Sequence, residues 1–226
     1  MRAQLSRGVA AVDRHPSAIL LGAQLLALLA YPFFENTPAG RAALGTTGIL
    51  VLLLALQMVH RTAGGRRVVV AAAIAIPAGA AYLLAVLGGM RWLLPWGMGL
   101  EALFYFHAVA CLVAYMLADR RATRDELFAA GATFTLLAWA FAYVFATCQM
   151  VQPACLSTGI DPNAPHTWTE LLFFSFVLLS STGLGDIVPM SPAAHAIASL
   201  EIFVGVMYLA LVVSRLIGIA VTQRAR

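Results

Sequence analysis

Long apolar segments alternate with short polar ones along most of this chain. Six apolar segments approach the roughly 20 residues that a helix needs to cross a bilayer. They lie at residues 16–34, 42–59, 68–87, 96–117, 127–150 and 193–221. Charged or turn-forming residues separate them. The pattern predicts an all-α membrane protein with six transmembrane helices.

A seventh apolar segment, residues 167–179, is too short to cross the bilayer. It lies between the fifth and sixth predicted spans and leads into a run that contains two glycines. Backbone that is not helical is tolerated at membrane depth only inside protein or beside water. We therefore expect a re-entrant pore helix followed by an extended loop.

The composition agrees with a membrane protein. Hydrophobic residues make up 62% of the chain and charged residues 11%, whereas soluble domains carry about a quarter charged residues. The net charge of +4 comes from arginines that lie mainly between the apolar segments. We therefore expect membrane lipids, and no nucleic acid, as partners.

The arginines also predict an orientation. The N-terminus and the second–third and fourth–fifth gaps hold three arginines each, and two follow the last span. The gaps on the other side hold only Arg41 and Arg91. Because cytoplasmic loops carry the excess of positive charge, we expect both termini to be cytoplasmic in a plasma (inner) membrane. The expected parts are a cytoplasmic N-terminus (1–15), a four-helix transmembrane domain (16–118), a cytoplasmic linker (119–126) and a pore domain (127–226).

The run from Ser180 to Asp186 reads Ser-Ser-Thr-Gly-Leu-Gly-Asp. It resembles the signature of potassium channels, whose usual form is Thr-Thr-Val-Gly-Tyr-Gly-Asp. The similarity extends to Phe173-Phe174-Ser175, where many members carry Trp-Trp-Ser, and to Pro189 and Gly205. It covers residues 127–221. The chain is similar to bacterial six-span subunits with a two-helix pore domain and no voltage-sensing arginines.

This resemblance implies a homotetrameric pore in which four copies of the loop surround potassium ions with backbone carbonyl oxygens. Such a loop needs alternating backbone conformations, some with positive φ, which Gly183 and Gly185 adopt at little cost. The implied roles are ion binding at Ser181, Thr182, Gly183, Leu184 and Gly185, the outer mouth at Asp186, a gating hinge at Gly205, and the cavity or gate at Val206, Leu209 and Val213.

Two residues depart from the usual signature. Thr182 replaces a valine, and Leu184 replaces a tyrosine whose hydroxyl would brace the filter. A non-selective or sodium-permeable cation channel therefore stays open as an alternative. The Thr182 hydroxyl could lie behind the filter or within it.

Two residues of the last span have competing interpretations. Glu201 is an acidic residue in an apolar segment, which is costly. We expect it to brace the filter from behind, through Ser175 or Ser180, with ion binding or proton sensing as the alternative. Gly205 serves either as a hinge or as a site of close helix packing.

The fourth span, residues 96–117, contains no arginine. Voltage sensors need such charges in the membrane, so we do not expect voltage gating of the usual kind. The first four helices are either a degenerate sensor-like domain or unrelated packing around the pore. Because the sequence ends shortly after the last span, we expect any ligand control to come from a separate regulatory subunit or from a mechanism within the membrane.

Cys148 and Cys155 lie on the predicted extracytoplasmic side and form a candidate disulfide. We expect no cofactor besides potassium as the permeant ion, and no enzymatic activity. A hydrolase that pairs Ser180 or Ser181 with His195 is the enzymatic alternative, but no Gly-x-Ser-x-Gly motif is present. A non-conducting membrane scaffold is a third class.

Overall fold

The computed structural model describes residues 16–34, 51, 53–58, 60, 64–118, 123–157 and 165–224. Most of the predicted second span, residues 42–59, lies outside this set, although residues 51 and 53–58 are helical. The predicted N-terminus (1–15) and residues 119–122 of the predicted linker also lie outside the described residues.

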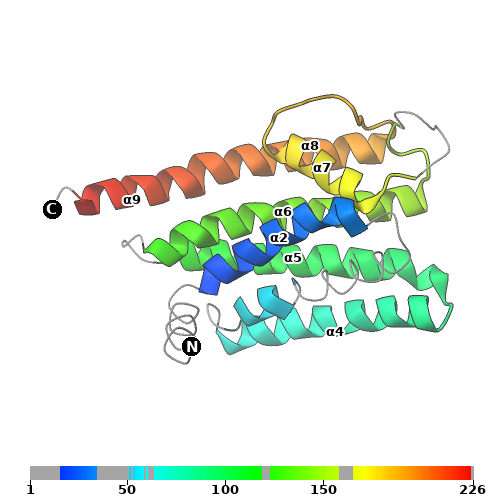
Figure 1. Ribbon diagram of the computed structural model, residues 1–226, viewed down its shortest axis with the longest axis horizontal. Coiled ribbons are helices and arrows are strands. Elements are labelled where there is room, and N and C mark those ends of the chain that lie inside the picture. The colour runs from blue at the N-terminus through cyan, green and yellow to red at the C-terminus, as the bar shows by residue number, and fades with distance from the viewer. Residues whose placement is uncertain are drawn as a thin grey trace.

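The described chain is built from helices (Figure 1). The first helices are α2 (Pro16–Phe34), α4 (Gly65–Leu87), the short 3₁₀ helix η1 (Arg91–Leu93), α5 (Leu94–Met116) and α6 (Arg124–Val151). They are followed by α7 (Trp168–Leu179), α8 (Pro192–Met207), the π-helical segment η2 (Tyr208–Val213) and α9 (Ser214–Arg224). The last three form one continuous rod (Figure 1).

Four of these helical stretches are long and apolar enough to cross a membrane among the residues described. They are Gly65–Ala85, Arg91–Met116, Arg124–Val151 and Pro192–Ile219. The stretches Pro16–Tyr31 and Trp168–Leu179 are apolar but shorter. These helices confirm a membrane protein of the all-α class.

Helix α2 runs parallel to α6, and one register holds along their whole contact. The Asp125 carboxylate accepts hydrogen bonds from the backbone N–H and the hydroxyl of Ser17, at 3.1 and 2.8 Å. Two helical turns further on, Gln24 donates to the Ala132 carbonyl, and then Tyr31 packs against Trp139. A spacing of seven residues on both helices keeps the same faces together.

The neighbouring helices alternate in direction. Phe106 of α5 meets Phe141 of α6, and Tyr105 stacks on Tyr143, so these two helices are antiparallel. Helices α4 and α5 are antiparallel as well, and they approach closely where Gly97 faces Ala81. The core lies along α6, whose middle turns from Leu136 to Ala142 are buried throughout. Helix α6 thus joins the first helices to α7 and α8.

Candidate functional site

Helix α7 is held firmly at its first turn. The Thr167 hydroxyl accepts from the Glu170 N–H at 3.3 Å, and the Glu170 carboxylate accepts from the Thr167 N–H at 2.7 Å. This reciprocal pair is a capping box. Trp168 packs against Tyr143 of α6, with ring centroids 4.3 Å apart, and also touches Tyr31 of α2. The start of α7 is therefore fixed by α2 and α6.

The chain after α7 folds back onto the last turn of the helix. The N–H groups of Ser180, Ser181 and Thr182 donate to carbonyls of Phe176, Leu178 and Val177, at 3.0, 2.9 and 3.0 Å. Residues 182–185 beyond this turn are neither helix nor strand, and the chain then reaches α8. In Figure 1, α7 and this loop lie at the end of the bundle opposite the C-terminus.

Backbone conformations in the loop alternate. Ser181, Gly183 and Gly185 have positive φ angles of 57°, 65° and 77°, whereas Thr182 and Leu184 do not. The prediction of positive φ at Gly183 and Gly185 is confirmed, and the positive φ of Ser181 was missed. A chain that alternates in this way turns successive carbonyls toward one side, so a row of oxygens can face an ion.

The side chains of the predicted filter residues have the following contacts and exposure within a single chain. The Thr182 hydroxyl lies 2.7 Å from the Ser180 hydroxyl. The Leu184 side chain is 62% exposed. Asp186 directly follows Gly185, and its carboxylate accepts from the Ile187 N–H at 3.1 Å. The role of Asp186 at an outer mouth stays a prediction.

Glu201 lies buried between α7 and α8. Its carboxyl group and the Ser175 hydroxyl are both fully buried and face each other. Neither group has a partner at ordinary hydrogen-bond geometry in a single chain. Ser180, the other expected partner of Glu201, instead donates to the Phe176 carbonyl at 2.6 Å. Bracing through Ser175 therefore fits the geometry better than bracing through Ser180.

Gly205 packs directly against the last residue of α7. A Cβ atom at this position would stand 2.0 Å from the Leu179 carbonyl oxygen and 2.8 Å from its carbonyl carbon. Only glycine allows the two backbones to approach so closely. The close-packing interpretation of Gly205 therefore has direct support, and the hinge role stays a prediction.

The inner helix changes its hydrogen-bonding pattern just after Gly205. Residues 208–213 form a π-helical segment, and π-bulges occur frequently at functional sites. Tyr208, the first residue of the segment, donates its hydroxyl to the Ala130 carbonyl of α6 at 2.6 Å. Of the predicted cavity or gate residues, Val206 and Leu209 are 48% and 44% exposed in one chain, and Val213 is partly exposed. The sequence gives no signal for this segment.

The chain beyond the loop is held by a short antiparallel pairing. Leu156 forms a bridge with Pro189, and Ser157 exchanges hydrogen bonds with Val188 through its N–H, at 2.8 Å, and its hydroxyl, at 2.9 Å. His166 then ties Ser157 to the start of α7, because its Nε2 donates to the Ser157 carbonyl at 2.6 Å. These contacts fix the stretch just after Asp186.

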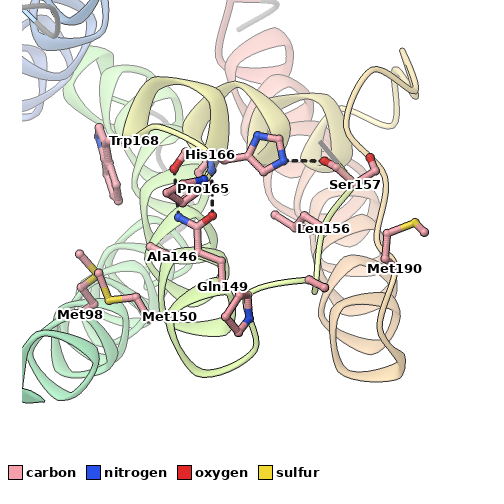
Figure 2. A pocket seen from close by; sticks show the side chains of 13 residues that line it. Met98, Ala146, Gln149, Met150, Leu156, Ser157, Pro165, His166, Trp168 and Met190 are labelled. Carbon is pink, nitrogen blue, oxygen red and sulfur yellow. Dashed lines mark hydrogen bonds between the residues drawn. The ribbon is translucent and has the colours of Figure 1, made fainter. Parts of the chain in front are cut away.

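A cavity of about 1000 Å³ lies beside this pairing (Figure 2). Gln149, at the end of α6, closes one side of it by bonding both the N–H and the carbonyl of His166, at 3.1 and 3.0 Å. The His166 ring also lies 3.6 Å from the Glu170 carboxylate. The remaining wall is largely apolar and includes Met98 and Leu156.

All three cysteines are free thiols in the structure. Cys148 and Cys155 lie close enough to interact, and burial together with this contact raises the pKa of the Cys155 thiol to about 12. The backbone carbonyl of Cys155 accepts from the N–H of Met190 at 2.8 Å. The predicted disulfide would therefore attach the end of α6 to the pairing beyond the loop, and it stays a prediction.

His195 does not join Ser180 or Ser181. Its Nδ1 lies 2.9 Å from the Ser191 carbonyl, one turn earlier in the same helix, whereas the Ser180 hydroxyl is bonded to Phe176 and Thr182. No group of three or more His, Cys, Asp or Glu side chains suited to a metal ion occurs within the described ranges.

The long apolar helices indicate that this chain is a membrane protein. Residues 130–222 match a protein family described as "Ion channel". The match spans α6, α7, the loop and most of the last helix, and it supports a passive ion channel rather than an enzyme. Neither the curated proteins nor the solved structures contain a match to this chain.

Proposed function

We propose that this chain is one subunit of a potassium-selective channel, in which four copies surround one pore and potassium ions pass without energy input. The observation that carries the proposal is the alternation of positive φ at Ser181, Gly183 and Gly185. A potassium ion that loses its water needs a ring of oxygens at each step along the filter, and backbone carbonyls aligned on one side of four loops supply them.

The direction of α7 supports the same role. The carboxyl end of a helix carries partial negative charge, and the loop begins at this end of α7. Four such helix ends around one axis would favour a cation below the filter. Because one chain contributes one loop, conduction requires assembly, and the homotetramer is part of the proposal.

Six spans fit the directions of the described helices. Helices α4 and α6 are both antiparallel to α5, and α2 is parallel to α6. Helices α2 and α4 therefore point the same way, which is the arrangement expected if one span, the predicted 42–59, lies between them in the sequence. Together with the arginine distribution, it gives cytoplasmic termini in a plasma membrane.

Gating by voltage through α5 is not part of the proposal. This helix, Leu94–Met116, contains no Arg or Lys, so it has no charge of the kind that voltage sensors move through the membrane field.

The test is ion flux through the full-length protein reconstituted in liposomes. We expect potassium and rubidium flux, little sodium flux, and a bi-ionic reversal potential that favours potassium. Leu184, which lacks the tyrosine hydroxyl of the usual signature, leaves a non-selective or sodium-permeable cation channel as the second candidate. Equal permeability to sodium and potassium would identify it. A tetramer without flux of either ion would contradict both candidates and leave a scaffold role.

A further inference from the structure

A chain of two hydroxyl groups links the loop to α7. The Ser180 hydroxyl lies 2.6 Å from the Phe176 carbonyl and 2.7 Å from the Thr182 hydroxyl. A carbonyl can only accept, and a serine hydroxyl has a single proton. Ser180 therefore donates to Phe176, and Thr182 donates to Ser180. The direction of both hydrogen bonds follows from the chemistry alone.

Thr182 is consequently attached to α7 at two points. Its backbone N–H donates to the Val177 carbonyl at 3.0 Å, and its side chain reaches the helix through Ser180. In a trans peptide the carbonyl points away from the following N–H, and the described chain has no cis peptide bond. Since the Thr182 N–H points back to α7, the Ser181 carbonyl points away from it. The two attachments thus hold an oxygen on the side where an ion would pass.

The rest of the loop has less side-chain support. Leu184 has no polar atom in its side chain, and Gly183 and Gly185 have no side chain. Asp186 uses a carboxylate oxygen on its own neighbour, Ile187. Within one chain, and among the residues that the structure describes, Thr182 is the loop residue whose side chain is hydrogen-bonded toward α7.

We infer that Thr182 is a positioning residue for ion selectivity, acting through Ser180 to keep the Ser181 carbonyl at a fixed distance from the ion. This inference rests on the proposed function. A loop that loses this attachment moves inward more easily, so its oxygens accommodate the smaller sodium ion better. In this inference the ion contact is made by the Ser181 carbonyl, and the Thr182 hydroxyl acts on it through its hydrogen bond to Ser180.

The experiment compares Thr182→Val, Thr182→Ser, Ser180→Ala and the double variant Thr182→Val/Ser180→Ala in the full-length channel. Valine matches threonine in shape and lacks only the hydroxyl. Thr169→Val is the matched control. The Thr169 hydroxyl is buried on α7 and has no hydrogen-bond partner within one chain. Each variant is first checked for tetramer assembly, and its potassium-to-sodium permeability ratio is then taken from bi-ionic reversal potentials.

We expect Thr182→Val and Ser180→Ala each to lower this ratio roughly five-fold, which corresponds to about 1 kcal/mol, the usual net value of one hydrogen bond. The permeability ratio of the double variant should be no lower than that of either single variant, because each single substitution already removes the same hydrogen bond. Thr182→Ser should stay within about two-fold of the wild type, since its hydroxyl can still reach Ser180. Thr169→Val should leave the ratio unchanged.

Three results would overturn the inference while leaving the proposed function intact. They are a wild-type ratio in an assembled Thr182→Val channel, a wild-type ratio in Ser180→Ala, and additive losses in the double variant. If Thr182→Val does not assemble, the permeability ratio of Ser180→Ala tests the inference. This variant removes the hydroxyl that accepts from Thr182 and keeps the threonine. A wild-type channel that does not distinguish potassium from sodium would instead refute the proposed function.

Discussion

Replacing Gly205 with alanine tests the contact between the inner helix and the end of α7. The added Cβ would stand 2.0 Å from the Leu179 oxygen, 2.8 Å from its carbonyl carbon and 3.0 Å from its Cα. Carbon and oxygen atoms normally approach no closer than about 3.3 Å, so one backbone must move by about 1 Å. Leu179 directly precedes Ser180, and the movement would therefore reach the loop.

The expected cost can be bounded. Overpacking in a tight interior costs typically about 1–3 kcal/mol, and the upper end applies here because the obstacle is backbone rather than a flexible side chain. Alanine recovers about 1 kcal/mol through its better helix propensity. We expect a net loss of about 2 kcal/mol. This loss lowers the melting temperature of the protein by about 4–8 °C and reduces potassium flux.

Gly218→Ala is the matched control, because Gly218 lies on the same rod and a Cβ there meets nothing within 4 Å. It should leave stability unchanged or raise it slightly. The assay is thermal unfolding of both purified variants, followed by liposome flux. A Gly205→Ala protein that melts and conducts like the wild type would refute the close contact. Unchanged stability with reduced channel opening would favour the hinge role instead.

Three other predictions follow from single contacts. Gly183→Ala places a side chain at φ 65°, which costs about 1–2 kcal/mol of conformational free energy. We expect this variant to assemble without potassium flux in liposomes. Normal flux would contradict the assignment of this loop as the filter. Asp125→Ala removes two hydrogen bonds from Ser17 and should destabilise the protein by about 2–3 kcal/mol, as measured by thermal unfolding, with a smaller loss for Asp125→Asn. Because burial and the contact with Cys148 raise the pKa of the Cys155 thiol to about 12, only a small fraction of this thiol is ionised at pH 7, and the fraction grows as the pH rises. In the reduced protein, maleimide labelling of Cys155, located by peptide mapping, should therefore be slow at pH 7 and faster at pH 9, and rapid labelling at pH 7 would contradict the buried environment.

Much of the helical architecture could be predicted from the sequence, because hydrophobic length is the dominant signal in a membrane chain. The first segment was predicted at the bounds that α2 has, Pro16–Phe34. Helix α6 begins three residues before its predicted start, since the Thr123–Glu126 capping box adds a polar first turn that an apolar pattern does not include.

The details of the site were harder to predict. Positive φ at Gly183 and Gly185 could be predicted because glycine adopts this conformation at little cost. Ser181 adopts it in a turn where its own N–H and those of Ser180 and Thr182 donate to α7, and its residue type does not predict this. The residue types from Tyr208 to Val213 are typical of an ordinary apolar helix. They do not predict the π-helical hydrogen-bonding pattern that this segment has. The bond from His166 to Ser157 joins residues nine positions apart, which no local pattern of residue types predicts.

Several contacts that shape the loop lie within one chain. They include the backbone bonds to α7, the Thr182 hydroxyl bond and the pairing of Ser157 with Val188, and the alternating φ angles are present in the same single chain. Ordering a flexible segment costs about 1–2 kcal/mol per residue, and a loop that is ordered before assembly does not add this cost to the association of subunits. In the proposed tetramer, four loops of defined shape would therefore come together. Substitutions behind the loop should consequently alter ion selectivity more than they alter the number of subunits that assemble.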